Sequence, residues 1–544
     1  MKKIIVLAIT LLMLVACGQA NLTTTKGEAD GYGGPIVAEV SVDDKGVIKK
    51  LTLTGEKETP SIGGEALPKL QEAILKAGKV DGVDAIAGAT WTSNGVFNAV
   101  NKALGIEPEA DSGKADGGST SASNLKHGIA VVSTPRLGPG KDDKEVPVYS
   151  LNEVVAYAVV DNEGKLVDLE VDILEIITPN HDSPEDNRFA GWPGNSYNYD
   201  ENSDGTVDKE LVESDEEWVN RLTAYTTKRE QGSAYKMNSG TWEQEMDIYE
   251  EWLKGKTASE IKEAFATLFS DVNGRPLNGK SENEKDVAKL AELTDDQKAQ
   301  IDALAGATMS ISDAHGDMIG AIVKAMENAT AVSSDQDYSK VGLGVVVTPR
   351  LGPGKDDQEV PVYSFNVVVA GSLVDAQGKI VDSVVDIMEI ITPNHDSAED
   401  NVFTGWPGQS YNGDLDGDGK VEGVVDQDED SFVSVAPAYR TKRMLGSAYK
   451  MNSGTWEQEM DIYEEFFKGM SANEIKEAFA TLFSDVNGRP LNGKSENEKD
   501  VAKLAELTDD QKAQIDALAG ATMSISDAHG DMIGALVESI NNAK

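Results

Sequence analysis

The sequence predicts an α+β fold that occurs three times in tandem, once as a minimal unit and twice as long, near-identical copies. Residues 134–143 recur as residues 348–357, and the offset of 214 residues then holds to the last residue. Residues 232–321 match their partners almost throughout, so the two copies must share one fold. In each unit strand patterns come first and helical patterns follow, which is the order typical of α+β domains.

The strand patterns are hairpins. In the first unit, IVAEVSV over residues 36–42 alternates apolar and polar positions, residues 43–46 form a turn, and VIKKLTLTG over residues 47–55 alternates again. The long copies repeat this pattern around turns at residues 161–164 and 375–378. We therefore expect an antiparallel hairpin near the start of each unit.

Polar segments set the domain boundaries. The minimal unit covers residues 31–106 and the long copies cover residues 127–328 and 341–544. Residues 107–126 and 329–340 are rich in small polar residues, so we expect linkers that do not pack. From the Thr-Pro pair to the closing turn, the long copies span 128 positions (Thr178 to Gly306), against 29 in the first unit (Thr59 to Gly88). About 99 extra residues therefore form a mostly helical, acidic insertion.

Residues 1–17 are typical of an exported lipoprotein. Two lysines precede an apolar run that is too short to span a bilayer, and Leu-Val-Ala-Cys follows. We expect cleavage before Cys17, lipid attachment to its thiol, a spacer over residues 18–30, and a place on the extracellular face of the cell membrane. The alternative is an ordinary signal peptide that ends in a chance cysteine.

Composition excludes several classes of protein. Cys17 is the only cysteine, so the chain cannot hold an internal disulfide, a c-type haem or a thiolate-bound iron–sulfur cluster. The formal net charge of -45 repels phosphate backbones, which excludes nucleic-acid binding. Any redox centre must therefore use other chemistry.

Each unit closes with a Gly-Ala-Thr turn ahead of a helical pattern. The turns are Gly88-Ala89-Thr90 before Thr92, Gly306-Ala307-Thr308 before Ser310, and Gly520-Ala521-Thr522 before Ser524. This motif resembles that of the FMN-binding domain family, found in subunits of ion-translocating redox complexes and in electron-transfer lipoproteins of Gram-positive bacteria. The resemblance implies up to three covalent FMN groups, esterified through phosphate to Thr92, Ser310 and Ser524.

The chemistry of the turn is consistent with this assignment. A hydroxyl suffices for a phosphoester, small residues leave the turn accessible, and a turn that leads into a helix offers free N–H groups to a phosphate. In the first unit, Glu58 and Thr59 lie in a segment that resembles one near the flavin in the family. Two departures are alanine before each glycine, where the family usually has serine or threonine, and serine as two of the acceptors. The alternative for any single turn is a helix cap.

A second constellation lies in the insertions. Oxygen-bearing residues at positions 1, 3, 5 and 9 and glycine at position 6 fit most of an EF-hand-type calcium loop, but position 12 holds Leu211 or Val425. Calcium binding and a solvated acidic loop both remain open. The candidate ligands are Asp200, Asn202, Asp204, Asp208, Asp414, Asp416, Asp418 and Glu422.

These features predict an electron carrier without substrate chemistry of its own. The resemblance implies a flavin transferase, a membrane quinol or NADH-linked electron donor, and extracellular electron acceptors as partners. Two alternatives stay open: a surface flavin reductase with its own substrate, and a calcium-stabilised surface binding or adhesion lipoprotein.

Overall fold

The computed structural model describes residues 22–30, 35–43, 45–55, 57, 63–80, 83, 86, 90–105, 120–142, 147–180, 187–193, 196–199, 209–212, 214–237, 239–312, 316–356, 361–394, 401–407, 410–413, 422–426, 428–451, 453–527 and 529–544. The chain divides into two compact units, Met1–Asp116 and Gly117–Lys544. Both combine helices with antiparallel sheet, so the predicted α+β class is confirmed.

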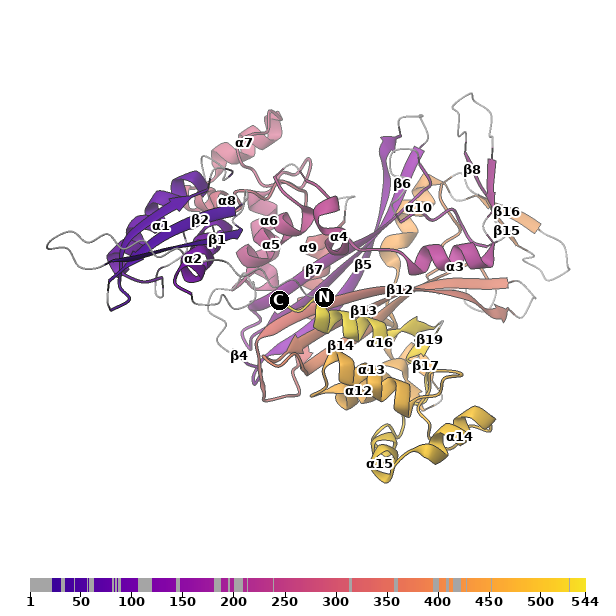
Figure 1. Cartoon of the computed structure of the whole chain (residues 1–544). Coiled ribbons are helices and arrows are strands. Elements are labelled where there is room, and N and C mark those ends of the chain that lie inside the picture. The colour runs from indigo at the N-terminus through magenta and orange to yellow at the C-terminus, as the bar shows by residue number, and fades with distance from the viewer. Residues whose placement is uncertain are drawn as a thin grey trace, which may run out of the picture. The chain divides into compact units, whose positions relative to one another are not determined.

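The first unit is a three-stranded sheet with two helices (Figure 1). The predicted hairpin is present as β2 and β3. The elements are β1 (Thr23–Asp30), β2 (Pro35–Val42), β3 (Ile48–Thr54), α1 (Gly63–Ala77) and α2 (Thr90–Ala103).

The spacer predicted over residues 18–30 is wrong from Thr23 onward. Strand β1 pairs with β2 from Thr23 against Val42 to Asp30 against Pro35, so this segment completes the sheet. Pairing satisfies backbone groups that β2 would otherwise leave open at an edge. Helix α2 also packs on β1, and the two backbones approach so closely that a Cβ at Gly27 would lie 2.1 Å from the carbonyl oxygen of Ala99.

The second unit contains both long copies, and each begins with a three-stranded meander. Each predicted hairpin of the long copies is present as its second and third strands. The six strands are β5 (Lys126–Lys141), β6 (Pro147–Val160), β7 (Leu166–Ile177), β12 (Lys340–Lys355), β13 (Pro361–Val374) and β14 (Ile380–Ile391).

The remaining elements of the second unit are largely helical and also recur in the two copies. The first copy contains β4 (Thr120–Ser121), β8 (Ser196–Tyr199), β9 (Lys209–Val212), α3 (Asp215–Thr223), α4 (Lys228–Gln231), the 3-10 helix η1 (Gly232–Ala234), α5 (Trp242–Leu253), α6 (Ala258–Leu268), α7 (Glu284–Glu292), α8 (Asp295–Asp302) and α9 (Met318–Glu327). The second contains β15 (Ser410–Gly413), β16 (Glu422–Asp426), α10 (Glu429–Val435), η2 (Ala436–Ala438), α11 (Lys442–Leu445), η3 (Gly446–Ala448), β17 (Lys450–Met451), β18 (Gly454–Thr455), α12 (Trp456–Phe467), α13 (Ala472–Leu482), α14 (Glu498–Glu506), α15 (Asp509–Ala517), β19 (Ser526–Asp527), β20 (Gly530–Asp531) and α16 (Met532–Asn541).

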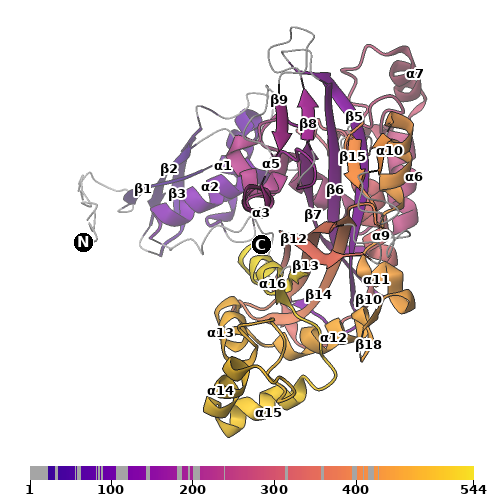
Figure 2. The ribbon, with the colours of Figure 1, turned by 90° about the vertical axis from the view of Figure 1, so that its right-hand side faces the viewer.

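The two meanders share one core. Tyr157 and Val159 of β6 pack in the same cluster as Val367 and Val369 of β13. The opposite face of each sheet is covered by its own copy's helices, α5, α6 and α9 on one side and α12, α13 and α16 on the other (Figure 2). The two copies therefore form one packed body, with sheets inside and helices outside.

The segment between the copies packs too, which corrects the linker predicted over residues 329–340. It contains β10 (Thr330–Ala331), which pairs with β5, and β11 (Asp337–Tyr338), which pairs with β4. The Tyr338 side chain is buried, and its hydroxyl donates to Asp168 at 2.7 Å. The aromatic ring of Tyr338 thus packs in the core and holds this otherwise polar segment against it.

The closing helices of the long copies begin later than their apolar pattern predicts. Helix α9 starts at Met318, eight residues after Ser310. Gly316 has φ +137°, which interrupts a right-handed helix, and Asp317 then caps the new helix by accepting from the Gly320 N–H at 2.9 Å. Helix α16 repeats this arrangement, with Gly530 at φ +140° and Asp531 as the cap.

Candidate functional site

The candidate acceptor of the first unit lies at the start of a helix. Thr92 is in the first turn of α2, and its side chain is buried at 1% exposure. The next residue, Ser93, accepts from the Ile86 N–H at 3.0 Å, which holds the preceding segment against the helix. Thr90 begins α2. Glu58, Thr59, Gly88 and Ala89 lie outside the described residues.

In the long copies, one buried carboxylate organises the Gly-Ala-Thr turn. Glu245 of α5 accepts from the Thr308 N–H at 2.6 Å, from the Met309 N–H at 2.8 Å and from the Thr308 hydroxyl at 2.8 Å. Glu459 of α12 makes the same contacts with Thr522 and Met523. A buried carboxylate with this many donors fixes the backbone of the turn firmly.

These contacts correct the expectation that the turn offers free N–H groups to a phosphate. The N–H groups of Thr308 and Met309 already donate to Glu245, and the Ala307 N–H donates to the carbonyl of Leu304. The turn also does not lead directly into α9, which starts at Met318. A phosphate at Ser310 must therefore find other partners.

The two serine hydroxyls are buried and have no hydrogen-bond partner among the described residues. Ser310 is 7% exposed and Ser524 is 8% exposed, and the Oγ atom of each is unpartnered. Buried hydroxyls normally make a hydrogen bond, so these two atoms need an explanation. The sequence motif marks these same two atoms as the candidate FMN acceptors.

A hollow adjoins the turn in the second copy. It has a volume of about 530 Å³ and is lined by Asp461, Ile462, Glu465, Phe466 and Ala517. Ile462 links it to the turn, because a Cβ at Gly520 would lie 3.2 Å from its Cδ1 atom. Two of its lining residues are carboxylates, and Ile462 and Phe466 provide the apolar part of its surface.

The repeated Ser-Ala-Tyr-Lys-Met-Asn-Ser-Gly-Thr-Trp block meets the turn through its serine. The Ser239 hydroxyl donates to the Thr308 hydroxyl at 3.2 Å. The aromatic residues of this block in the second copy do not line the hollow: Trp456 is buried in the core, and Tyr449 packs against the Lys442 ammonium, which is 5.2 Å from its ring centroid. Residue type at these positions is explained by packing.

Sequence reasoning missed Glu245 and Glu459. Each lies 63 residues from the threonine that it contacts, and both belong to a block that is identical in the two copies. Because nearly every residue of that block is repeated, repetition alone could not distinguish these two glutamates from their neighbours.

The candidate calcium ligands lie outside the residues whose side chains the structure describes. Asp200, Asn202, Asp204, Asp208, Asp414, Asp416 and Asp418 lie outside the described residues, and the side chain of Glu422 is not described either. Within the part of the chain that the structure describes, no group of three or more histidine, cysteine, aspartate or glutamate side chains could hold a metal ion. In the same part, no helix is both long and apolar enough to cross a membrane.

Comparison with known proteins assigns the first unit. Residues 31–105 match the model of the FMN-binding domain family, so this part of the chain is an FMN-binding domain and the resemblance of its motif is confirmed. A chlorophenol reductase of Desulfitobacterium hafniense is 33% identical over 187 residues, which cover 33% of this chain and 51% of the relative. The chain thus spans about half the length of that relative. Together the two likenesses indicate a flavin-associated redox role.

Proposed function

We propose that the protein is a lipid-anchored electron carrier with FMN esterified to Thr92, Ser310 and Ser524. One observation carries the proposal: the turn of the matched FMN-binding domain recurs in both long copies, where it is followed by a buried serine hydroxyl that has no partner among the residues that the structure describes. The fold around the turn is also similar in the three units. In all three units a three-stranded meander packs on the closing helix through a glycine: Gly27, Gly128 or Gly342.

The residues around the long-copy turns have defined roles in this proposal. Bound FMN supplies one- or two-electron redox chemistry. Glu245 and Glu459 fix the turn, and the buried serine Oγ atoms carry the ester in a place that excludes water. A covalent link keeps the flavin on a protein that works outside the cell, where a dissociated cofactor would be lost by dilution.

We further propose that Cys17 anchors the chain to the cell membrane, and that flavin transferase, a membrane quinol or NADH-linked donor, and extracellular acceptors are its partners. The two long copies share one core, so electron exchange between their flavins crosses a packed body and does not depend on a loose chain of separate domains.

A reductase with its own substrate is the second candidate. The similarity to a chlorophenol reductase favours it, because that relative is named as an enzyme that acts on an aromatic substrate. Rapid reoxidation of the reduced protein by one class of aromatic substrate, and not by other acceptors of similar potential, would support this candidate over the carrier.

The redox role is tested by anaerobic reductive titration of the full-length chain, produced together with a flavin transferase. The proposal predicts a flavin spectrum that bleaches on reduction and returns with several unrelated electron acceptors. A colourless chain would contradict it.

A further inference from the structure

A short loop of the insertion lies directly on each serine acceptor. We call Ser270–Pro276 and its counterpart Ser484–Pro490 the acceptor loops. The first is anchored by α7: the Ser270 hydroxyl donates to the buried carboxylate of Asp286 at 2.7 Å, and Lys289 donates to Asp271 at 2.7 Å and to the Phe269 carbonyl at 2.7 Å. The second loop is held in the same way by Asp500 and Lys503. The acceptor loops are therefore built parts of the fold.

Glycine brings each loop against the acceptor. A Cβ at Gly274 would lie 2.4 Å from the Ser310 Oγ atom, and a Cβ at Gly488 would lie 2.5 Å from the Ser524 Oγ atom. The Gly274 carbonyl also accepts from the Ile311 N–H at 3.4 Å. No side chain fits at these positions, so glycine allows the loop backbone to pass directly beside the hydroxyl.

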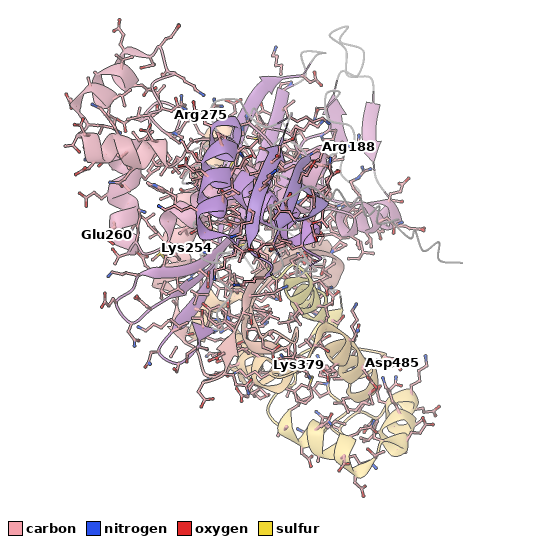
Figure 3. The ribbon with its side chains drawn as sticks, turned by 60° about the vertical axis from the view of Figure 1, so that its left-hand side comes forward. Arg188, Lys254, Glu260, Arg275, Lys379 and Asp485 are labelled. Atoms are coloured by element: carbon pink, nitrogen blue, oxygen red, sulfur yellow. The ribbon has the colours of Figure 1, made fainter. Side chains whose placement is uncertain are left out.

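An arginine follows that glycine in both loops. Arg275, which Figure 3 labels, and Arg489 are exposed. Their guanidinium groups make no hydrogen bond or ion pair among the described residues. The charge of Arg275 acts on Tyr249. The Tyr249 hydroxyl donates to the carbonyl of Met309, the residue before Ser310. Burial and the Glu245 carboxylate raise the pKa of Tyr249, whereas the Arg275 guanidinium lowers it. Arg489 has the same relation to Tyr463.

A phosphoester at this place needs a cation. A phosphodiester keeps one negative charge, the chain has a formal net charge of -45, and Glu245 already places a carboxylate on the turn. Arginine is well suited to phosphate because its planar guanidinium presents paired donors.

We propose that Arg275 and Arg489 bind the phosphate of the FMN esterified to Ser310 and Ser524, respectively. This inference rests on the proposed function and adds the residues that recognise the cofactor in the long copies. The acceptor loops belong to the insertion, which the first unit lacks, so FMN at Thr92 is independent of them.

The test uses the full-length chain without flavin, a flavin transferase and its flavin dinucleotide donor. The rate of FMN attachment is measured separately at Ser310 and Ser524 by mass spectrometry of their peptides. Arg275→Ala should slow attachment at Ser310 by about tenfold, the value of one charge-assisted hydrogen bond, and leave Ser524 unchanged. Arg489→Ala should do the reverse, so each site is the other's control.

Two further variants separate recognition from general effects. Lys285→Ala removes an exposed positive charge from α7 of the same copy and should leave both rates unchanged. Arg275→Lys keeps the charge, and in the flavinylated protein it should move only the Ser310-linked phosphorus NMR signal. Because the Arg275 guanidinium has no hydrogen-bond or ion-pair partner among the described residues, its variants should keep the melting temperature of the parent chain.

The outcomes distinguish the two proposals. Equal rates at Ser310 in the parent chain and Arg275→Ala would overturn this inference alone. FMN at neither serine of the parent chain would overturn covalent flavinylation of the long copies, and this inference with it.

Discussion

The indole Nε1 of Trp192 donates to the carbonyl oxygen of Phe403 at 2.8 Å, and this bond joins the two long copies. Its counterpart, from Trp406 to Phe189, measures 2.7 Å, and both partners are shifted by the repeat offset of 214 residues. All four side chains are buried in the shared core. The copies therefore contact each other reciprocally, as the subunits of a symmetric dimer do.

Substitution at this contact should destabilise both copies together. Trp192→Phe leaves the buried Phe403 carbonyl without its partner and should cost about 1 to 3 kcal/mol of unfolding free energy. Calorimetry should show one transition for the two long copies, lowered in temperature by Trp192→Phe and equally by Trp406→Phe. Two separate transitions, with only one moved by each variant, would contradict a shared core.

The stability of the second unit should fall as pH rises through the titration of Glu153. Burial raises the pKa of this carboxyl from 4.5 to about 7, although the Ser133 hydroxyl, which donates at 2.6 Å, lowers it. The folded state thus binds the Glu153 proton more tightly than the unfolded chain does. Proton binding at Glu153 therefore stabilises the fold fully below pH 4.5, and this stabilisation is lost by about pH 7. The free energy of unfolding should therefore be about 3 kcal/mol lower above pH 7 than below pH 4.5 because of this carboxyl.

Glu153→Gln tests this pH dependence. It should stabilise the protein at pH 8 and change little near pH 4, measured by denaturant unfolding. The second copy suggests the control variant, because it has Val347 and Val367 at the positions equivalent to Ser133 and Glu153. The double variant Ser133→Val, Glu153→Val should therefore show the same pH dependence as Glu153→Gln. Equal effects at both pH values would show that this carboxyl does not titrate with folding.

Removing the carboxylate beneath a turn should impair FMN attachment at that turn only. Glu245→Ala leaves the N–H groups of Thr308 and Met309 without their acceptor, so the turn loses its fixed geometry. Peptide mass spectrometry should show several-fold lower FMN occupancy at Ser310 and normal occupancy at Ser524. Glu459→Ala should invert this result. Loss at both serines from either variant would indicate general unfolding instead.

The segment between the copies should resist proteolysis. Its strands are paired, and Tyr338 is buried with its hydroxyl on Asp168. Tyr338→Ala should expose residues 329–340 to limited digestion, which mass mapping of the fragments would detect. Early cleavage of the parent chain within this segment would restore the prediction of an unpacked linker.

The sequence predicted local structure better than long-range contacts. The hairpin around residues 43–46 follows from alternation and from Asp43, whose carboxylate accepts from the Lys45 and Val47 N–H groups at 3.0 Å. The helix expected from Ser310 failed because Gly316 and Asp317 restart it at Met318. The apolar pattern does not reveal that interruption, since the side chains on both sides of it are buried.

The candidate site was predicted only in part. The motif identified Ser310 and Ser524, but the residues that fix their turns and lie against them come from α5, α12 and the acceptor loops, which are distant in sequence. The repeat shows which residues are equivalent, but it does not show that Trp192 of one copy meets Phe403 of the other. Such pairing depends on how two apolar sheet faces pack, and only the fold reveals it.

The central claim is covalent FMN at three hydroxyls, and intact mass of the denatured full-length chain, produced with a flavin transferase, tests it most directly. The account predicts three FMN-minus-water increments, one of which is lost in each of Thr92→Ala, Ser310→Ala and Ser524→Ala, with in-gel flavin fluorescence falling in step. A chain without any increment, or one whose increments survive all three substitutions, would contradict it.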